Sequence, residues 1–106
     1  ILHKVPKEQF IAQTLGVELY LEAGIRGVEI GSILADRDPV TRKERYSDLE
    51  LLRLAIPRRT YTNNHMAVVA AAMKNVMARA DKIVSGYRIV EEAPILRHFT
   101  VKLEKI

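Results

Sequence analysis

The stretch LLRLAIP, residues 51–57, constrains the fold more than any other, because its apolar residues favour a β-strand. Successive side chains of a strand point to opposite faces, so every second residue from Leu52 to Ile56 is expected to face a core. Arg53 lies on the other face, among apolar or small neighbours. A guanidinium in that setting needs a partner, which either another side chain or a ligand must supply.

The segments around this strand alternate between helical and extended patterns. Gly24 is suited to the left-handed position that follows a helix end. The expected elements are a helix over residues 6–23, a strand over 25–34, a loop over 36–48, a strand over 50–57, a helix capped by Thr62 or Asn63, and strands over 87–90 and 96–104. This order predicts an α+β fold, in which one antiparallel sheet carries the helices packed on one face. We expect a single domain over residues 1–106.

Composition narrows the class of protein. The 106 residues carry a net charge of +4, but bases and acids are interleaved, and residues 36–48 contain four of each, so no nucleic-acid-binding patch is indicated. The absence of cysteine excludes disulfides and thiolate metal sites and fits a cytoplasmic protein. No apolar run reaches the roughly 18 to 20 residues of a membrane span. The chain begins at Ile1 without a methionine, so we expect it to be part of a longer polypeptide.

The residues alone leave the partner of Arg53 open. An acid on a neighbouring strand is one alternative, and Glu29 between Gly27 and Gly31 is the obvious candidate. The functional alternative is that the planar fork of Arg53 grips a carboxylate or phosphate of a ligand with two hydrogen bonds.

Other polar residues give weaker signals. His98 falls on the polar face of the predicted strand 96–104, where it could border a pocket or simply be half exposed. Arg58 and Arg59, followed by Tyr61, could hold phosphate, although a solvated pair is the simpler interpretation. The histidine spacings match no zinc site, so we assign no metal. No glycine-rich phosphate loop or nucleophile constellation is present.

Several stretches taken together resemble a known family. They are EQFIAQTL, AGIRGVEIGS, RDPVT, ELLRLAIPRRTYTNNHM and LRHFTVKL, in this order and spanning nearly the whole chain. They are similar to the carboxyl-terminal portion of the tryptophanases (tryptophan indole-lyases), which with the tyrosine phenol-lyases belong to the β-eliminating, pyridoxal-phosphate-dependent lyases. The resemblance implies the small C-terminal domain of a fold-type I pyridoxal-phosphate enzyme.

The resemblance implies which parts of that enzyme bind the cofactor and which bind the substrate. Pyridoxal phosphate and the lysine that forms a Schiff base with it would lie upstream, so these residues contain no catalytic group and no cofactor-binding residue, and would be inactive alone. Arg53, the arginine of LLRL, would bind the α-carboxylate of the substrate. L-Tryptophan would be cleaved to indole, pyruvate and ammonia.

The resemblance also bears on the choice of amino acid. The phenol-lyases have an arginine at the position of Ile30, whereas VEI, containing Val28 and Ile30, is apolar and suits an indole ring. They have phenylalanine at the position of His98, which would lie near the substrate ring with Phe99 beside it. Tyrosine phenol-lyase activity is the alternative within the family. The resemblance further implies a homotetramer and a potassium ion as activator.

Two alternatives lie outside the family. A small anion-binding module would use Arg53, Arg58 and Arg59, and its affinity would fall as salt rises. An inert structural fragment would unfold cooperatively without any effect of ligand.

Overall fold

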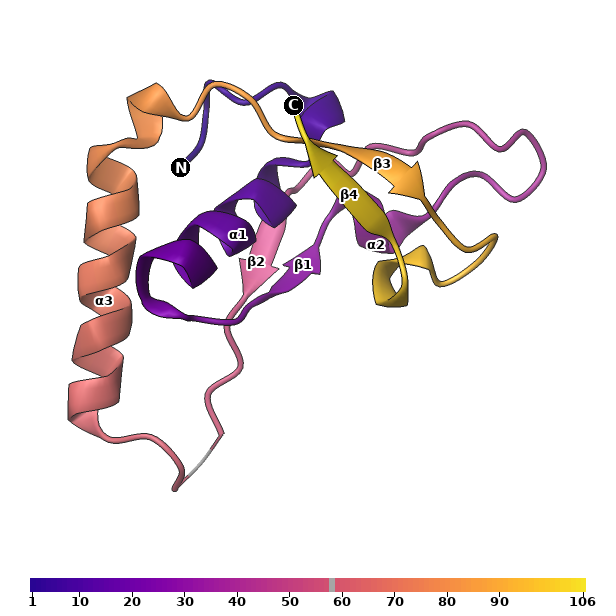
Figure 1. Cartoon of the computed structure of the whole chain (residues 1–106). Coiled ribbons are helices and arrows are strands. Elements are labelled where there is room, and N and C mark those ends of the chain that lie inside the picture. Colours follow the sequence, from indigo (N-terminus) through magenta and orange to yellow (C-terminus); the bar gives the residue numbers. More distant parts are fainter. Residues whose placement is uncertain (58) are drawn as a thin grey trace.

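The computed structural model describes residues 1–57 and 59–106. It confirms the α+β class and the antiparallel pairing of strands. The strands form two separate ribbons, β1 (Val28–Ile30) with β2 (Leu51–Arg53), and β3 (Tyr87–Glu91) with β4 (Lys102–Lys105). Figure 1 shows the two ribbons side by side, each with its own strand pair.

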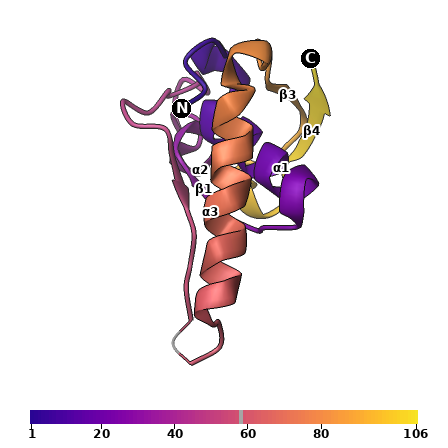
Figure 2. The same ribbon diagram turned by 90° about the vertical axis from the view of Figure 1, so that its left-hand side faces the viewer.

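The two long helices form successive layers on the β1–β2 ribbon. Helix α1 (Ile11–Ala23) contacts both strands of this ribbon, and α3 (Asn63–Ala78) packs on α1. Figure 2 shows α3 running along the side of the molecule with α1 behind it. The buried core lies between these layers, and two residues from the start of the chain belong to it. Its members are Leu2, Val5, Leu19, Ala72, Val76, Ala80 and Ile83.

The ends of the helices follow from local sequence. Gly24 ends α1 with φ of 67°, and its N–H donates to the carbonyl of Tyr20 at 2.7 Å, as the glycine predicts. Thr62 caps α3: its hydroxyl accepts from the backbone N–H of His65, and the ring of His65 accepts from the N–H of Thr62. His65 is thereby a capping residue.

The remaining elements are short. Within residues 1–57 and 59–106, these are the short α-helix α2 (Ser32–Ala35) and the single-turn 3₁₀ helices η1 (Lys7–Gln9), η2 (Ala80–Lys82) and η3 (Arg97–Phe99). The predicted strand over 50–57 ends at Arg53, and Ile56 beyond it is 64% exposed, so the expectation that Ile56 faces the core is wrong. No helix in the described part of the chain has the length and apolarity to cross a membrane.

Gly86 joins the β3–β4 ribbon to the start of the chain. Its N–H donates to the Gln9 side chain at 2.7 Å, and a Cβ at this position would overlap the backbone carbonyl oxygen of Gln9. Because backbone atoms cannot give way cheaply, we expect Gly86→Ala to lower the free energy of unfolding by about 1 to 3 kcal/mol. Urea unfolding measures this, and Val84→Ala, at an exposed neighbour, is the control. Equal stability of both variants would contradict the contact.

Candidate functional site

The β1–β2 ribbon presents one core face and one exposed face. The register pairs Val28 with Arg53, Glu29 with Leu52, and Ile30 with Leu51. Directly paired residues of an antiparallel ribbon share a face. One face therefore carries Val28, Ile30, Leu51 and Arg53, and we call it the Arg53 face.

The opposite face of the ribbon is turned toward α1. Leu52 packs against the core, and a Cβ at Gly16 of α1 would lie 3.2 Å from its side chain. On the Arg53 face, by contrast, Val28 is 41% and Leu51 51% exposed, and Arg53 is exposed as well. The face thus offers a guanidinium beside apolar side chains, which is a suitable surface for an amino acid with an apolar side chain.

Glu29 is not the partner of Arg53, so that alternative is wrong. The Glu29 side chain is on the opposite face, and its carboxylate accepts from the backbone N–H groups of Gly31 (2.9 Å), Ile33 (2.9 Å) and Leu34 (3.1 Å). A carboxylate at the start of a helix accepts from the first N–H groups, which have no partner within that helix. Glu29 therefore fixes the start of α2 to β1.

His98 and Phe99 lie on η3, so the predicted strand over 96–104 is wrong in its first half. Leu96 has φ of 51°, which breaks the extended backbone, and only Lys102–Lys105 remain as β4. The rings of His98 and Phe99 are 4.1 Å apart between centroids and tilted by 40°. Phe99 is 75% exposed, whereas Nδ1 of His98 is buried without a hydrogen-bond partner in the described part of the chain.

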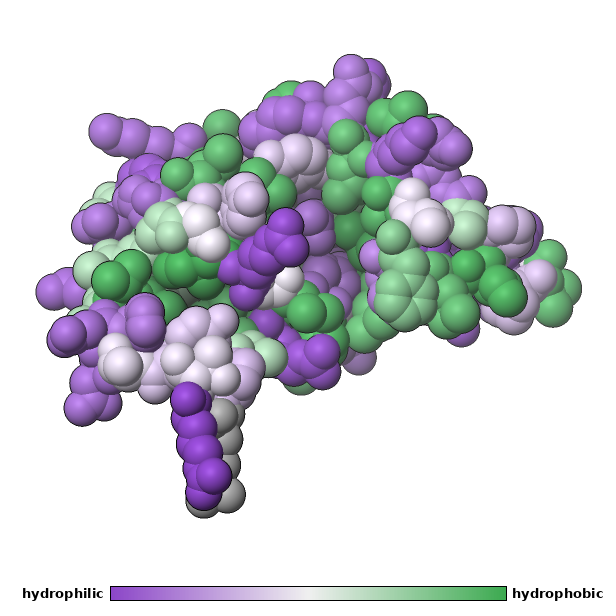
Figure 3. Space-filling model, turned by 60° about the horizontal axis from the view of Figure 1, so that its bottom comes forward, coloured by the Kyte–Doolittle hydropathy of each residue, from purple (hydrophilic) through white to green (hydrophobic). Residues whose placement is uncertain are grey.

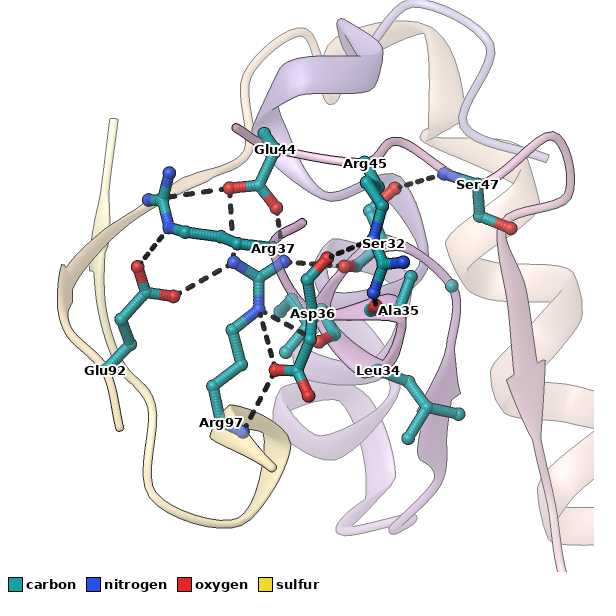
Figure 4. Close-up of polar contacts among 12 residues, drawn as sticks. Ser32, Leu34, Ala35, Asp36, Arg37, Glu44, Arg45, Ser47, Glu92 and Arg97 are labelled. Carbon is teal, nitrogen blue, oxygen red and sulfur yellow. Dashed lines mark hydrogen bonds and ion pairs between the residues drawn. The ribbon is translucent and has the colours of Figure 1, made fainter. Parts of the chain in front are cut away.

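Arg97 is the main residue that sequence reasoning missed. The alternating pattern predicts a strand residue, but its side chain is only 1% exposed. Figure 4 shows its guanidinium surrounded by Glu44, Glu92 and residues of α2, where it donates to the carbonyls of Ser32 and Ile33. The acids of residues 36–48 and Glu92 were a weak signal, but no pattern in the sequence pairs them with Arg97.

Arg37, Glu44, Glu92 and Arg97 form a charged cluster in which each charge stabilises its neighbours. Burial by itself lowers the pKa of Arg97. Its hydrogen bonds to Glu44 and Glu92 outweigh the effect of burial, so the net shift of this pKa is upward. Burial raises the pKa of Glu92, and the hydrogen bonds from Arg37 and Arg97 reverse this, so that the net shift is downward. Both shifts favour the charged forms, so the cluster is a network of ion pairs at neutral pH.

The structure brings the predicted site residues into two groups. Val28, Ile30 and Arg53 share the Arg53 face, and His98 and Phe99 stack on η3. The short helix α2 joins the groups, because it follows β1 and contacts η3. Figure 3, in which the bottom of Figure 1 comes forward, shows hydrophobic residues interspersed with hydrophilic ones on that face of the molecule.

Arg58, Arg59 and Tyr61 were the candidates for a phosphate site. Arg58 lies outside the described residues. Arg59 is exposed in a turn with φ of 65°, and Tyr61 packs edge-on against His65 with ring centroids 5.4 Å apart. Tyr61 thus supports the start of α3.

The residues present do not fit a pyridoxal phosphate site of their own. All seven lysines are exposed, so none occupies the enclosed position that a covalently bound cofactor requires. Among the described residues, no group of three or more His, Asp or Glu side chains is placed to hold a metal ion.

Comparison with known proteins identifies the family. Residues 3–72 match the beta-eliminating lyase family, and the chain belongs to this family. It is 69% identical over its whole length to a probable beta-eliminating lyase of Trichomonas vaginalis, and 49% identical over its whole length to a tryptophanase of Escherichia coli O157:H7. The chain spans 23% and 22% of the lengths of these two relatives.

Proposed function

We propose that this chain works as the C-terminal part of a full-length lyase that uses pyridoxal phosphate to cleave L-tryptophan into indole, pyruvate and ammonia. The observation that carries the proposal is the exposed Arg53 beside Val28 on the face turned away from the core. The 49% identity to a tryptophanase over the whole chain supports the choice of substrate.

Arg53 would bind the α-carboxylate of the substrate. An arginine forms two parallel hydrogen bonds with a carboxylate, which fixes both the position and the rotation of the amino acid. Fixing the substrate in this way turns a loosely held reactant into one whose reacting bond is aligned. The β-strand position of Arg53 makes this anchor more rigid than a loop would.

His98, Phe99, Ile30 and Val28 would form part of the pocket for the indole ring. Indole leaves only when the ring carbon that was bonded to Cβ gains a proton, so groups beside the ring influence this step. The Nδ1 atom of His98 is buried within the chain, and the imidazole ring lies against the exposed ring of Phe99, so the two rings would present one surface to the indole. Ile30 offers no hydrogen bond to a phenol hydroxyl, which disfavours tyrosine.

The cofactor would be held by the rest of the polypeptide. Pyridoxal phosphate supplies an electron sink, and the protein supplies orientation and protonation. The proposal includes a cytoplasmic homotetramer that uses potassium, which the resemblance to the tryptophanases implies.

The experiment that tests this function compares two substrates in the full-length enzyme. We expect His98→Phe to lower kcat/KM for L-tryptophan by about tenfold and to change that for S-methyl-L-cysteine by less than about threefold, because only tryptophan brings a ring to the pocket. Spectrophotometric indole and pyruvate assays provide both values. Equal losses would refute the ring contact, and absence of indole release by the unmodified enzyme would refute the function.

A further inference from the structure

We propose that Arg97 is a positioning residue that fixes the His98–Phe99 ring pair relative to the Arg53 face and thereby sets the preference for ring-bearing substrates. This inference rests on the proposed function. It concerns a residue that would touch neither substrate nor cofactor, and that acts through the backbone of η3.

The first argument is that the hydrogen bonds of Arg97 are complete. Its Nε donates to the Ile33 carbonyl at 3.0 Å and its Nη2 to the Ser32 carbonyl at 2.6 Å. Nη1 donates to Glu44 (3.1 Å) and Glu92 (2.9 Å), and Nη2 also donates to Glu44. All five N–H groups of the guanidinium are therefore used. Only arginine has a rigid fork that can join α2 to two separate carboxylates.

The second argument is that η3 is also held by its backbone. The two carboxylate oxygens of Asp36 accept separately from the N–H groups of Leu96 (3.0 Å) and Arg97 (3.2 Å). The N–H of Val101 donates to the carbonyl of Arg97 at 2.7 Å. His98 therefore lies on a turn fixed on both sides, although its own ring nitrogen makes no hydrogen bond within the described residues.

The third argument is that α2 connects this turn to the Arg53 face. Glu29 of β1 holds the N–H groups at the start of α2, and Arg97 holds two of its carbonyl groups. A continuous series of short polar contacts thus runs from the strand that pairs with Arg53 to the residue preceding His98. The distance between a carboxylate anchor and a ring contact selects the length of an amino acid, so this series sets which side chain fits.

Arg97→Lys in the full-length enzyme tests the proposal. Lysine keeps the charge but has three N–H donors on one atom, so it cannot reach all the acceptors. We expect kcat/KM for L-tryptophan to fall about ten- to hundredfold, and that for S-methyl-L-cysteine to change by less than about threefold. Combined with His98→Phe, the loss for tryptophan should be smaller than the product of the two single losses.

Arg37→Lys is the matched control. Arg37 binds the same carboxylates, Glu92 and Glu44, but makes no contact with the η3 backbone or the α2 carbonyl groups among the described residues. We expect this variant to retain the substrate preference. A purely structural role of Arg97 would lower the rates with both substrates equally, and this result, or no change in either rate, would overturn the proposal.

A second variant tests the proposal in case Arg97→Lys does not fold. Asp36→Asn leaves one acceptor oxygen where two backbone N–H groups are bound, and is expected to shift the substrate preference in the same direction. An unchanged preference in Asp36→Asn would overturn the proposal. If the unmodified enzyme acts on neither substrate, the proposed function fails. If it acts on both and the variants lose both activities equally, only the role of Arg97 fails.

Discussion

Replacing Arg53 with alanine is expected to weaken L-tryptophan binding by about 1.5 to 3 kcal/mol, which is roughly a ten- to hundredfold increase in KM. The physical reason is the loss of two charged hydrogen bonds to the α-carboxylate. The Arg53 guanidinium is exposed on the face of the β1–β2 ribbon turned away from α1, so the fold should persist without it. Steady-state kinetics of the full-length enzyme, with pyridoxal phosphate present, measure the effect.

The control for this prediction is Arg88→Ala. Arg88 is also an exposed strand arginine, but its Nε donates to Glu104 at 2.8 Å in the other ribbon, away from the Arg53 face. We expect its KM to match that of the unmodified enzyme. If Arg53→Ala keeps both KM and kcat, Arg53 does not bind the substrate.

The second large effect is expected from Arg97→Ala, which should lower the free energy of unfolding by about 3 to 5 kcal/mol. Removal of the guanidinium leaves the carbonyls of Ser32 and Ile33 without this donor in a nearly closed site. It also leaves the charges of Glu44 and Glu92 with Arg37 but without their bonds to Arg97. Urea unfolding measures the loss, and faster amide hydrogen exchange at Val101 would locate it on η3.

An exposed ion pair sets the scale of this loss. The exposed pair of Arg88 and Glu104 should contribute less than about 1 kcal/mol, because solvent screens it. A loss of this small size for Arg97→Ala would show that the buried network does not hold η3. A loss of several kcal/mol together with unchanged exchange at Val101 would place the stabilisation elsewhere.

The residues near β1 and β2 were largely predictable because their signals are local. Alternation placed Arg53 and Leu52 on different faces of the strand, and Gly24 marked the end of α1. Thr62, one of the two predicted caps, begins α3. The prediction that Glu29 pairs with Arg53 was wrong. A carboxylate that caps the next helix and one that pairs across strands have the same sequence context.

The segment around Arg97 was not predictable, because its structure depends on distant partners. Arg97, Phe99 and the apolar residues after them alternate as a strand would. The structure follows instead the contacts of Arg97 with Glu44 and Ser32, which are 53 and 65 residues away in the chain. Such pairings leave no periodic pattern, so a residue with this role emerges only when the fold is known.

The most direct test of the central claim is the product released by the full-length enzyme. It would be supplied with pyridoxal phosphate and given L-tryptophan or L-tyrosine in separate reactions. Our account predicts indole with pyruvate from tryptophan and far less phenol from tyrosine, in keeping with Ile30 and His98 at the ring pocket. Phenol as the main product, or neither product, would contradict it.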